Sequence, residues 1–330
     1  MPLRKAGIAG TGSYAPKDKI TNTDLEKMVD TSDEWITTRT GIKERRRAGP
    51  DQASSDLAYE ASIRALDDAG VSPDEVDTVI VCTVTPDMNF PSTACFLQKK
   101  LKTLNASAHD ISAACSGFIY GLRTARALIA TSEADTVLVA ATETLTKYTN
   151  YEDRTSCVLF GDAAGSAVLR PTDGPREVLH TSVGADGYSD AAMSMVLRNG
   201  GSQSPFSQEA LDNKEQYMVI RGREVYRFAV TKMAELIVAA AEQLGIPVTD
   251  IDWVVPHQAN LRILQGAAER AGYPEERFYI NLDKYGNSSA ASMPLALDEA
   301  VRDGSIKDGQ TIVLCAFGGG LSWGSATIRW

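Results

Sequence analysis

Cys115 is the residue of this 330-residue chain whose surroundings best suit covalent chemistry. It follows a strand-like run at residues 108–112 and precedes a helical pattern with Phe118 and Leu122 on one face. At such a turn, exposed backbone N–H groups and the helix dipole are expected to lower the thiol pKa and favour the thiolate. We therefore predict that Cys115 is a nucleophile, although its position alone also allows a small core residue.

The other cysteines lie in apolar strand or helix runs, and we interpret them as core residues: Cys82, Cys95, Cys157 and Cys315. The five cysteines include no CxxC pair, and their odd number fits a disulfide framework poorly. A reducing cytosol is the expected environment.

Two polar residues could act on a group held by that thiol. His257 follows the buried run 253–256, at the expected C-terminal end of a strand, where α/β proteins place reactive groups. Asn287 occupies a Gly-Asn turn before small residues that open a helix, so it too is expected at a strand-to-helix junction. Taken singly, the histidine could cap a helix and the asparagine could form a turn. His109 and His180 lie inside strand-like runs, and we interpret both as structural.

The run 317–324, with sequence FGGGLSWG, lies between two predicted strands. Glycines there would let a backbone N–H approach a reacting carbonyl, and a tight hairpin is the alternative. The chain has no Gly-x-x-x-x-Gly-Lys or Gly-x-Gly-x-x-Gly between strand and helix, which argues against a nucleotide loop.

Short apolar runs alternate with helical patterns, which predicts an α/β protein with covered sheets. The strand-like runs are 78–83, 136–141, 253–255 and 311–315, and helices are predicted at 92–101 and from Asn260.

Two sequence echoes indicate a duplicated α/β unit. Residues 69–81 recur as 244–256, and residues 165–170 recur as 324–329. We predict two halves, 1–172 and 173–330, with equivalent strand ends meeting at a shared crevice. Residues 199–206 are predicted to form a surface loop.

Composition excludes several classes of protein. Hydrophobic residues make up 43% of the chain, enough for a large core, which argues against disorder. The net charge of −10 argues against nonspecific nucleic-acid binding. No signal-type segment and no run of 18 apolar residues is present, so we expect a cytoplasmic protein without a membrane span.

Taken together, seven segments closely resemble the β-ketoacyl-acyl-carrier-protein synthase III family, the initiating condensing enzymes of type II fatty acid synthesis in the thiolase superfamily. They cover essentially the whole chain in order: GTGSY (10–14), TSDEWITTRTGI (31–42), AACSG (113–117), FGD (160–162), PHQANLR (256–262), KYGNSS (284–289) and FGGGLSWGSA (317–326).

The resemblance implies a thiolase-like α/β fold of two αβαβαββ-type halves in a five-layered αβαβα arrangement, usually as a homodimer. It implies ping-pong chemistry in which Cys115 takes the acyl group of an acyl-CoA, commonly acetyl-CoA. The N–H groups of Cys115 and Gly319 would hold the oxyanion. His257 and Asn287 would then drive decarboxylation of malonyl-acyl-carrier protein, giving a 3-oxoacyl-acyl-carrier protein without a metal or redox cofactor.

Binding roles carry over from the family on matching positions. Trp35 and Arg154 resemble the pair that sandwiches the CoA adenine. Further residues match the CoA and pantetheine tunnel: Arg39, Gly222, Asn260 and Arg262, with Tyr226 where relatives often have Phe. Candidates for docking the acidic carrier protein are Gln258, Ala259, Asn260, Leu261, Arg262, Arg227 and Arg270, with Glu269 interrupting the basic run. Phe90, reaching across the dimer, and Phe317 are assigned to the acyl pocket.

Related activities remain as alternatives. A thiolase would need a second cysteine at Ala316, and Cys315 is one residue away, on the opposite face of a strand. An elongating synthase would have a second histidine in place of Asn287, and a hydroxymethylglutaryl-CoA synthase would need a catalytic Glu that we cannot place. Secondary-metabolite starter synthases and acyltransferases of the same fold keep all three polar residues. A non-catalytic scaffold would be expected to lose Cys115.

Overall fold

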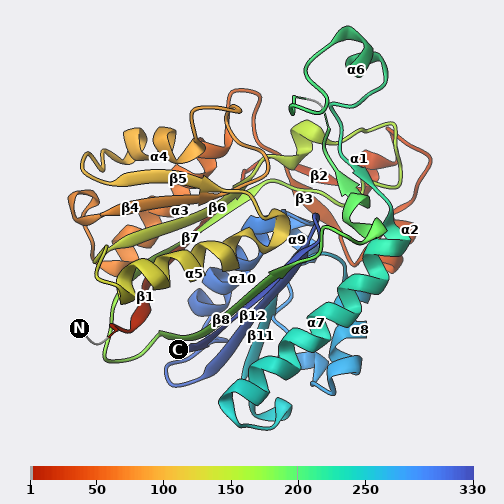
Figure 1. Ribbon diagram of the computed structural model, residues 1–330. Helices are drawn as coiled ribbons and strands as arrows, with labels where there is room; N and C mark the ends of the chain where they lie inside the picture. The colour runs from red at the N-terminus through yellow and green to blue at the C-terminus, as the bar shows by residue number, and fades with distance from the viewer. Residues whose placement is uncertain (1–2, 199) are drawn as a thin grey trace.

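The strands of the computed structural model, which describes residues 3–198 and 200–330, form two mixed sheets (Figure 1). Strands of the first sheet are β1 (Ala6–Tyr14), β4 (Thr78–Cys82), β5 (Ser107–Ile111), β6 (Val137–Glu143) and β7 (Ala163–Pro171). Those of the second are β8 (Glu177–Ala185), β11 (Trp253–Pro256), β12 (Thr311–Gly318) and β13 (Ser322–Arg329). Short strands lie outside them: β2 (Lys19–Thr21), β3 (Glu44–Arg46), β9 (Met195–Val196) and β10 (Val219–Ile220).

The strand order shows the duplication. The continuous order is β11-β12-β13-β8-β1-β7-β6-β4-β5, and β8 meets β1 at the single pair Gly7–Glu177. On either side of this junction, two antiparallel pairings lead to a parallel one: β1-β7-β6-β4 in one sheet and β8-β13-β12-β11 in the other. The counterpart of β5 is reduced to one parallel bridge between Phe278 and Val254.

The helices complete five layers. Their bounds are α1 (Asn22–Leu25), α2 (Asp33–Thr40), α3 (Ser54–Ala69), α4 (Thr93–Leu101), α5 (Gly117–Ala130), α6 (Gln208–Asp212), α7 (Gly222–Leu244), α8 (Leu261–Ala271), α9 (Leu282–Tyr285) and α10 (Ser292–Arg302). Helices α5 and α10 lie between the sheets, α3 and α4 cover the first sheet, and α7 and α8 cover the second (Figure 1). The predicted αβαβα arrangement is confirmed.

The largest hydrophobic core surrounds the two central helices. It joins Phe118 and Leu122 of α5, Met293 and Leu297 of α10, and apolar residues of both sheets. Since each central helix is covered on two sides, it is rich in small and apolar residues that permit close packing. Helix α5 begins two residues after Cys115, and α10 begins five residues after Asn287.

The turn between β7 and β8 separates the sheets at residues 172–176, close to the expected boundary. The division into 1–172 and 173–330 stays a prediction. Within 200–206 the chain forms largely exposed turns, as expected of a surface loop, while Asn199 lies outside the described residues. In the described ranges, no helix combines the length and apolarity needed to cross a membrane.

Two predictions about cysteines need correction. Cys95 is exposed on α4, since its position faces away from the sheet that buries Ala94 and Leu97. Cys157 is buried as expected, but it lies in a turn rather than in a helix or strand.

Candidate active site

Cys115 lies where the first sheet meets a central helix. It occupies a single 3₁₀ turn, η2 (Ala114–Ser116), between β5 and α5, as the sequence predicts. Ala114 has a φ of +45°, a strained conformation that turns the chain sharply just before the sulfur. Gly318 of β12 packs against this turn so closely that a Cβ there would lie 2.6 Å from the Cys115 nitrogen.

The pKa of the Cys115 thiol is raised, whereas the sequence predicts a lowered one. Burial raises the pKa of Cys115 to about 12, against the smaller lowering effects of the Ser289 hydroxyl and a backbone N–H. The side chain is only 4% exposed, so the cost of placing a thiolate away from water outweighs the N–H groups at the start of α5. The predicted lowering of this pKa is therefore wrong for this structure, in which the sulfur carries its proton.

His257 directly follows β11 and is held from two sides. Its backbone N–H donates to the Cys315 carbonyl at 2.8 Å, and its Nδ1 lies 2.8 Å from the Ser292 Oγ. The ring also packs edge-on against Phe317, with centroids 5.7 Å apart. Burial lowers the pKa of His257 to about 3, so the ring is neutral near pH 7.

Asn287 is positioned by a backbone contact with Phe160, a residue from a distant part of the chain. It lies between α9 and the 3₁₀ turn η7 (Ser289–Ala291), so the expected strand-to-helix junction is wrong. Instead, an isolated bridge to Phe160 anchors its backbone, with Asn287 N donating to the Leu159 carbonyl at 2.8 Å. Its Oδ1 accepts the backbone N–H of Ser289 at 2.9 Å, which makes Nδ2 the end that can donate to a ligand.

The three polar side chains share a cavity of about 120 Å³. Cys115, His257 and Asn287 line it together with Phe317, whose ring faces the imidazole. Three of the predicted tunnel residues also line the cavity: Gly222, Tyr226 and Asn260. Phe317 thus lines the same cavity as the three polar residues, and its assignment to the acyl pocket stays a prediction.

Cys115 also lines a second cavity, of about 100 Å³. Gly319 and Ser289 line it beside the sulfur, so the predicted oxyanion residues Cys115 and Gly319 are adjacent there. Its remaining lining is apolar: Val84, Ala114, Leu145, Phe160, Met195, Val196, Leu197 and Met218. Sequence reasoning missed these residues because they come from distant segments and carry no chemical signature.

Trp35 and Arg154, the pair predicted to sandwich the CoA adenine, stack directly on each other. The guanidinium carbon of Arg154 lies 4.6 Å from the Trp35 ring centre, and that of Arg39 lies 4.8 Å from it. Arg154 is tethered by a 2.9 Å hydrogen bond to the Asp30 carbonyl. Because Arg154 stacks directly on the indole, a planar ring can enter between them only if the guanidinium moves aside.

The N-terminus of α8 joins these residues to the catalytic cavity. The Asn260 side-chain amide donates to the Arg39 carbonyl at 3.1 Å, and Arg262 donates to the Thr38 carbonyl at 3.2 Å. Helices α2 and α8 are thus joined into one wall beside the cavity, which Asn260 at the N-cap of α8 and Gly222 at the start of α7 both line.

The predicted docking residues divide by exposure. Arg227, Arg262 and Arg270 are exposed, and Leu261 is half-buried. Gln258 and Ala259 are buried, so their assignment to a docking surface is wrong. The Gln258 amide donates to the carbonyls of Pro256 and Tyr279, which makes its role structural.

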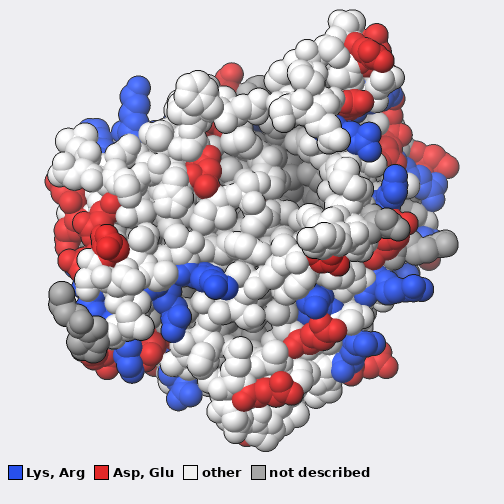
Figure 2. All heavy atoms as spheres, viewed as in Figure 1, with Lys and Arg blue, Asp and Glu red and all other residues white. Residues whose placement is uncertain are grey.

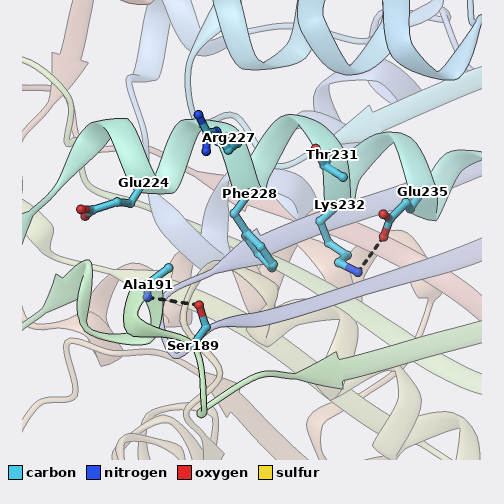
Figure 3. A pocket seen from close by; sticks show the side chains of 8 residues that line it. All are labelled: Ser189, Ala191, Glu224, Arg227, Phe228, Thr231, Lys232 and Glu235. Carbon is cyan, nitrogen blue, oxygen red and sulfur yellow. Dashed lines mark hydrogen bonds and ion pairs between the residues drawn. The ribbon is translucent and has the colours of Figure 1, made fainter.

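Basic and acidic side chains are mixed on the surface around the predicted docking residues. Arg227 lines a separate surface pocket of about 570 Å³ between α7 and the segment containing Ser189 and Ala191 (Figure 3). Two acidic residues, Glu224 and Glu235, line the same pocket. On the face drawn in Figure 2, blue and red residues are interspersed around a largely uncharged centre.

Phe90 lies outside both cavities. It is 85% exposed, in the segment between β4 and α4, and does not line the cavity of about 100 Å³ in its own chain. Its predicted role across a dimer stays a prediction.

Comparisons with known proteins identify the family of this chain. Residues 109–187 match the family model of 3-oxoacyl-[acyl-carrier-protein] synthase III, and residues 241–330 match the model of its C-terminal part. The chain is 53% identical over 325 residues to a β-ketoacyl-[acyl-carrier-protein] synthase III of Caldanaerobacter subterraneus subsp. tengcongensis, covering 98% of both proteins.

Two solved structures extend the comparison. The crystal structure of 3-oxoacyl-[acyl-carrier-protein] synthase III from Aquifex aeolicus VF5 superposes with a TM-score of 0.91 at 43% identity, covering 98% of this chain and 100% of that one. The priming β-ketosynthase of the R1128 polyketide pathway gives 0.90 at 35% identity, covering 99% and 97%. With a matching fold, full-length similarity and the three polar residues in one cavity, the chain belongs to the β-ketoacyl-[acyl-carrier-protein] synthase III family of condensing acyltransferases.

Proposed function

We propose that this protein condenses a short acyl-CoA with malonyl-acyl-carrier protein, releasing CO₂ and initiating fatty acid synthesis. One observation carries the proposal: Cys115, His257 and Asn287 line a single cavity, and Cys115 also lines a second, largely apolar cavity. A nucleophile, two hydrogen-bond donors and a space for an acyl chain are what such a condensation requires.

In the first half-reaction, the Cys115 sulfur attacks the thioester carbonyl of the acyl-CoA. The new S–C bond forms, the bond to the CoA sulfur breaks, and the thiol proton leaves Cys115 as CoA departs as its thiol. The N–H groups of Cys115 and Gly319 would stabilise the tetrahedral oxyanion. The acyl chain would then extend into the apolar cavity beside these residues.

In the second half-reaction, malonyl-acyl-carrier protein loses CO₂, and the electron pair moves into an enolate. Negative charge builds on the thioester oxygen, where the His257 ring and the Asn287 amide would donate hydrogen bonds. A neutral ring and a side-chain amide can both donate without surrendering a proton. The enolate carbon attacks the acyl carbon, and the Cys115 sulfur leaves as a thiolate that takes up a proton. No step uses a metal or redox cofactor.

The apolar cavity favours a short primer such as an acetyl group. Its volume is only about 100 Å³. Met195 and Met218 in its lining are flexible, so modest branching of the primer is compatible with the same pocket.

CoA would lie along the wall formed by α2 and α8, with its adenine between Trp35 and Arg154 and its pantetheine passing Arg39, Gly222, Asn260 and Arg262. The carrier protein would dock near Arg227, Arg262 and Arg270. We further propose a cytoplasmic homodimer in which Phe90 closes the acyl pocket of the other subunit.

A second candidate function is priming of a secondary-metabolite pathway. The similarity to the priming ketosynthase of the R1128 polyketide pathway favours it, since the same fold serves a different product there. Both candidates share the chemistry above and differ in the acyl group and the pathway.

Mass spectrometry after incubation with acetyl-CoA tests the proposal. The acetyl group should appear on Cys115 and should be absent from the Cys115→Ala variant, with the exposed Cys95→Ala variant as a matched control. Labelling at another residue would contradict the assignment. A series of acyl-CoA chain lengths in the same assay then separates short primers from the longer or branched ones of secondary metabolism.

A further inference from the structure

Ser292, the first residue of α10, makes the side-chain contact that orients the His257 ring. Its Oγ lies 2.8 Å from the ring Nδ1. The same oxygen accepts the backbone N–H of Gln258 at 3.2 Å and lies 2.9 Å from the Ser289 carbonyl oxygen. All four residues are at most 3% exposed, so water does not compete for these bonds.

The Ser292 hydroxyl has one proton, but two neighbouring atoms could accept it. A serine Oγ has one proton and two acceptor positions, and the N–H of Gln258 occupies one of those positions. The single proton can therefore be given either to the Ser289 carbonyl or to Nδ1 of His257, but not to both.

Each choice corresponds to a different tautomer of the ring. If the proton is given to Ser289, the Oγ presents a lone pair to the ring, Nδ1 carries the ring proton and Nε2 is an acceptor. If the proton is given to Nδ1, the ring proton lies on Nε2, which is then a donor. The Ser289 carbonyl keeps a partner in this second arrangement, because the backbone N–H of Ser292 also donates to it.

We propose that Ser292 is the positioning residue that sets His257 in its Nε2–H tautomer, by donating its hydroxyl proton to Nδ1, so that the ring can donate to the malonyl thioester oxygen. The inference rests on the proposed function and adds a residue that acts through the histidine.

The experiment compares Ser292→Ala with Ser288→Ala. Ser288 is a neighbouring buried serine whose Oγ has no hydrogen-bond partner among the described residues, so its variant controls for loss of a buried hydroxyl. ¹⁵N NMR of the histidine rings reports the tautomer, and the chain has three histidines, so His257→Ala identifies the relevant signals. Rates of Cys115 acetylation and of malonyl-acyl-carrier protein decarboxylation are measured on the same samples.

In the wild type and in Ser288→Ala, the proton should be found on Nε2. In Ser292→Ala, the tautomer population of the ring should shift towards the Nδ1–H form. Decarboxylation should fall by about tenfold to a hundredfold, which approaches the effect of removing one oxyanion donor. Acetylation should stay near the wild-type rate. Ser292→Cys, which keeps a weak donor of similar size, should give intermediate values and supplies the measurement if the alanine variant does not fold.

An unchanged tautomer and decarboxylation rate in Ser292→Ala would overturn the inference. So would an equal loss of acetylation and decarboxylation in Ser292→Ala if Ser288→Ala showed the same losses. Wild-type protein that is acetylated but forms no 3-oxoacyl product would instead contradict the proposed function.

Discussion

At the scale of single residues, the bonds made outside the catalytic cavity determine what each side chain offers inside it. The Asn287 Oδ1 is occupied by a backbone N–H, so the amide presents its donor end. Burial keeps His257 neutral and Cys115 protonated, because both charged forms would lose hydration. The residue types therefore suggest the chemistry, and their surroundings decide the form of each in this structure: an amide that presents its donor end, a neutral ring and a protonated thiol.

Replacing Asn287 by Asp tests the donor role with almost no change of shape. The carboxylate can still accept the Ser289 N–H, but it has no proton to donate and adds negative charge where the enolate forms. Decarboxylation of malonyl-acyl-carrier protein should fall by about 10²–10³-fold, while acetylation of Cys115 continues. Asn287→Ala and His257→Ala should show the same separation, and equal loss of both half-reactions would contradict the division of roles.

The raised pKa of Cys115 predicts a pH dependence for acylation. Because the pKa is about 12, the thiolate fraction below it grows about tenfold for each pH unit. The rate of Cys115 acetylation should therefore rise continuously from about pH 6 to about pH 9, as measured by quenched-flow mass spectrometry. A plateau near neutral pH would show that the thiol is activated in the working enzyme, as the helix N-terminus alone suggests.

At the scale of elements, glycines allow the segments around the site to approach each other. Gly318 leaves room for the backbone of Cys115, and Gly161 does the same for the segment that carries Asn287. A Cβ at Gly161 would lie 2.2 Å from the Tyr285 carbonyl oxygen, which no rotamer change can relieve. The bridge between Phe160 and Asn287 depends on this clearance.

The variant Gly161→Ala should consequently move Asn287. We expect a loss of stability of about 1–3 kcal/mol and a larger fall in decarboxylation than in acetylation, because Cys115 lies on another element. Thermal unfolding and the two half-reaction assays measure these effects. Gly187→Ala is the matched control, since a Cβ there meets no atom within 4 Å; equal effects of the two variants would refute the steric explanation.

At the scale of the whole molecule, the two sheets share their central helices, which places α5 and α10 between them (Figure 1). The outer edge of the first sheet is β5, whose residues are only partly buried. Phe90 is highly exposed in the nearby segment before α4. An open strand edge and an exposed aromatic side chain are features that association of two copies would cover.

If a second subunit receives Phe90, the protein should sediment as a dimer, and Phe90→Ala should enlarge the acyl pocket. The variant should then accept longer acyl-CoA chains than the wild type, measured by acyl transfer to Cys115 across a chain-length series. Phe206→Ala, at a side chain that is 72% exposed, serves as the control. A monomeric wild type, or unchanged chain-length preference in Phe90→Ala, would count against this arrangement.

The sequence by itself determined the fold class, the duplication and the three polar residues of the cavity. Each of the three polar residues lies in a contiguous segment with a recognisable pattern: a strand ending before Cys115, a strand ending before His257, and a glycine turn at Asn287. Such patterns depend on local backbone preferences and on periodicity, which a linear sequence displays directly.

The tertiary structure alone decided the raised pKa of Cys115, the burial of Gln258 and Ala259, the exposure of Cys95 and the lining of the apolar cavity beside Cys115. Each depends on desolvation or packing summed over atoms from segments far apart in the chain. Cys115 shows the difference most clearly. Its place at the start of a helix was predictable, but its protonation depends on all the groups that exclude water from it.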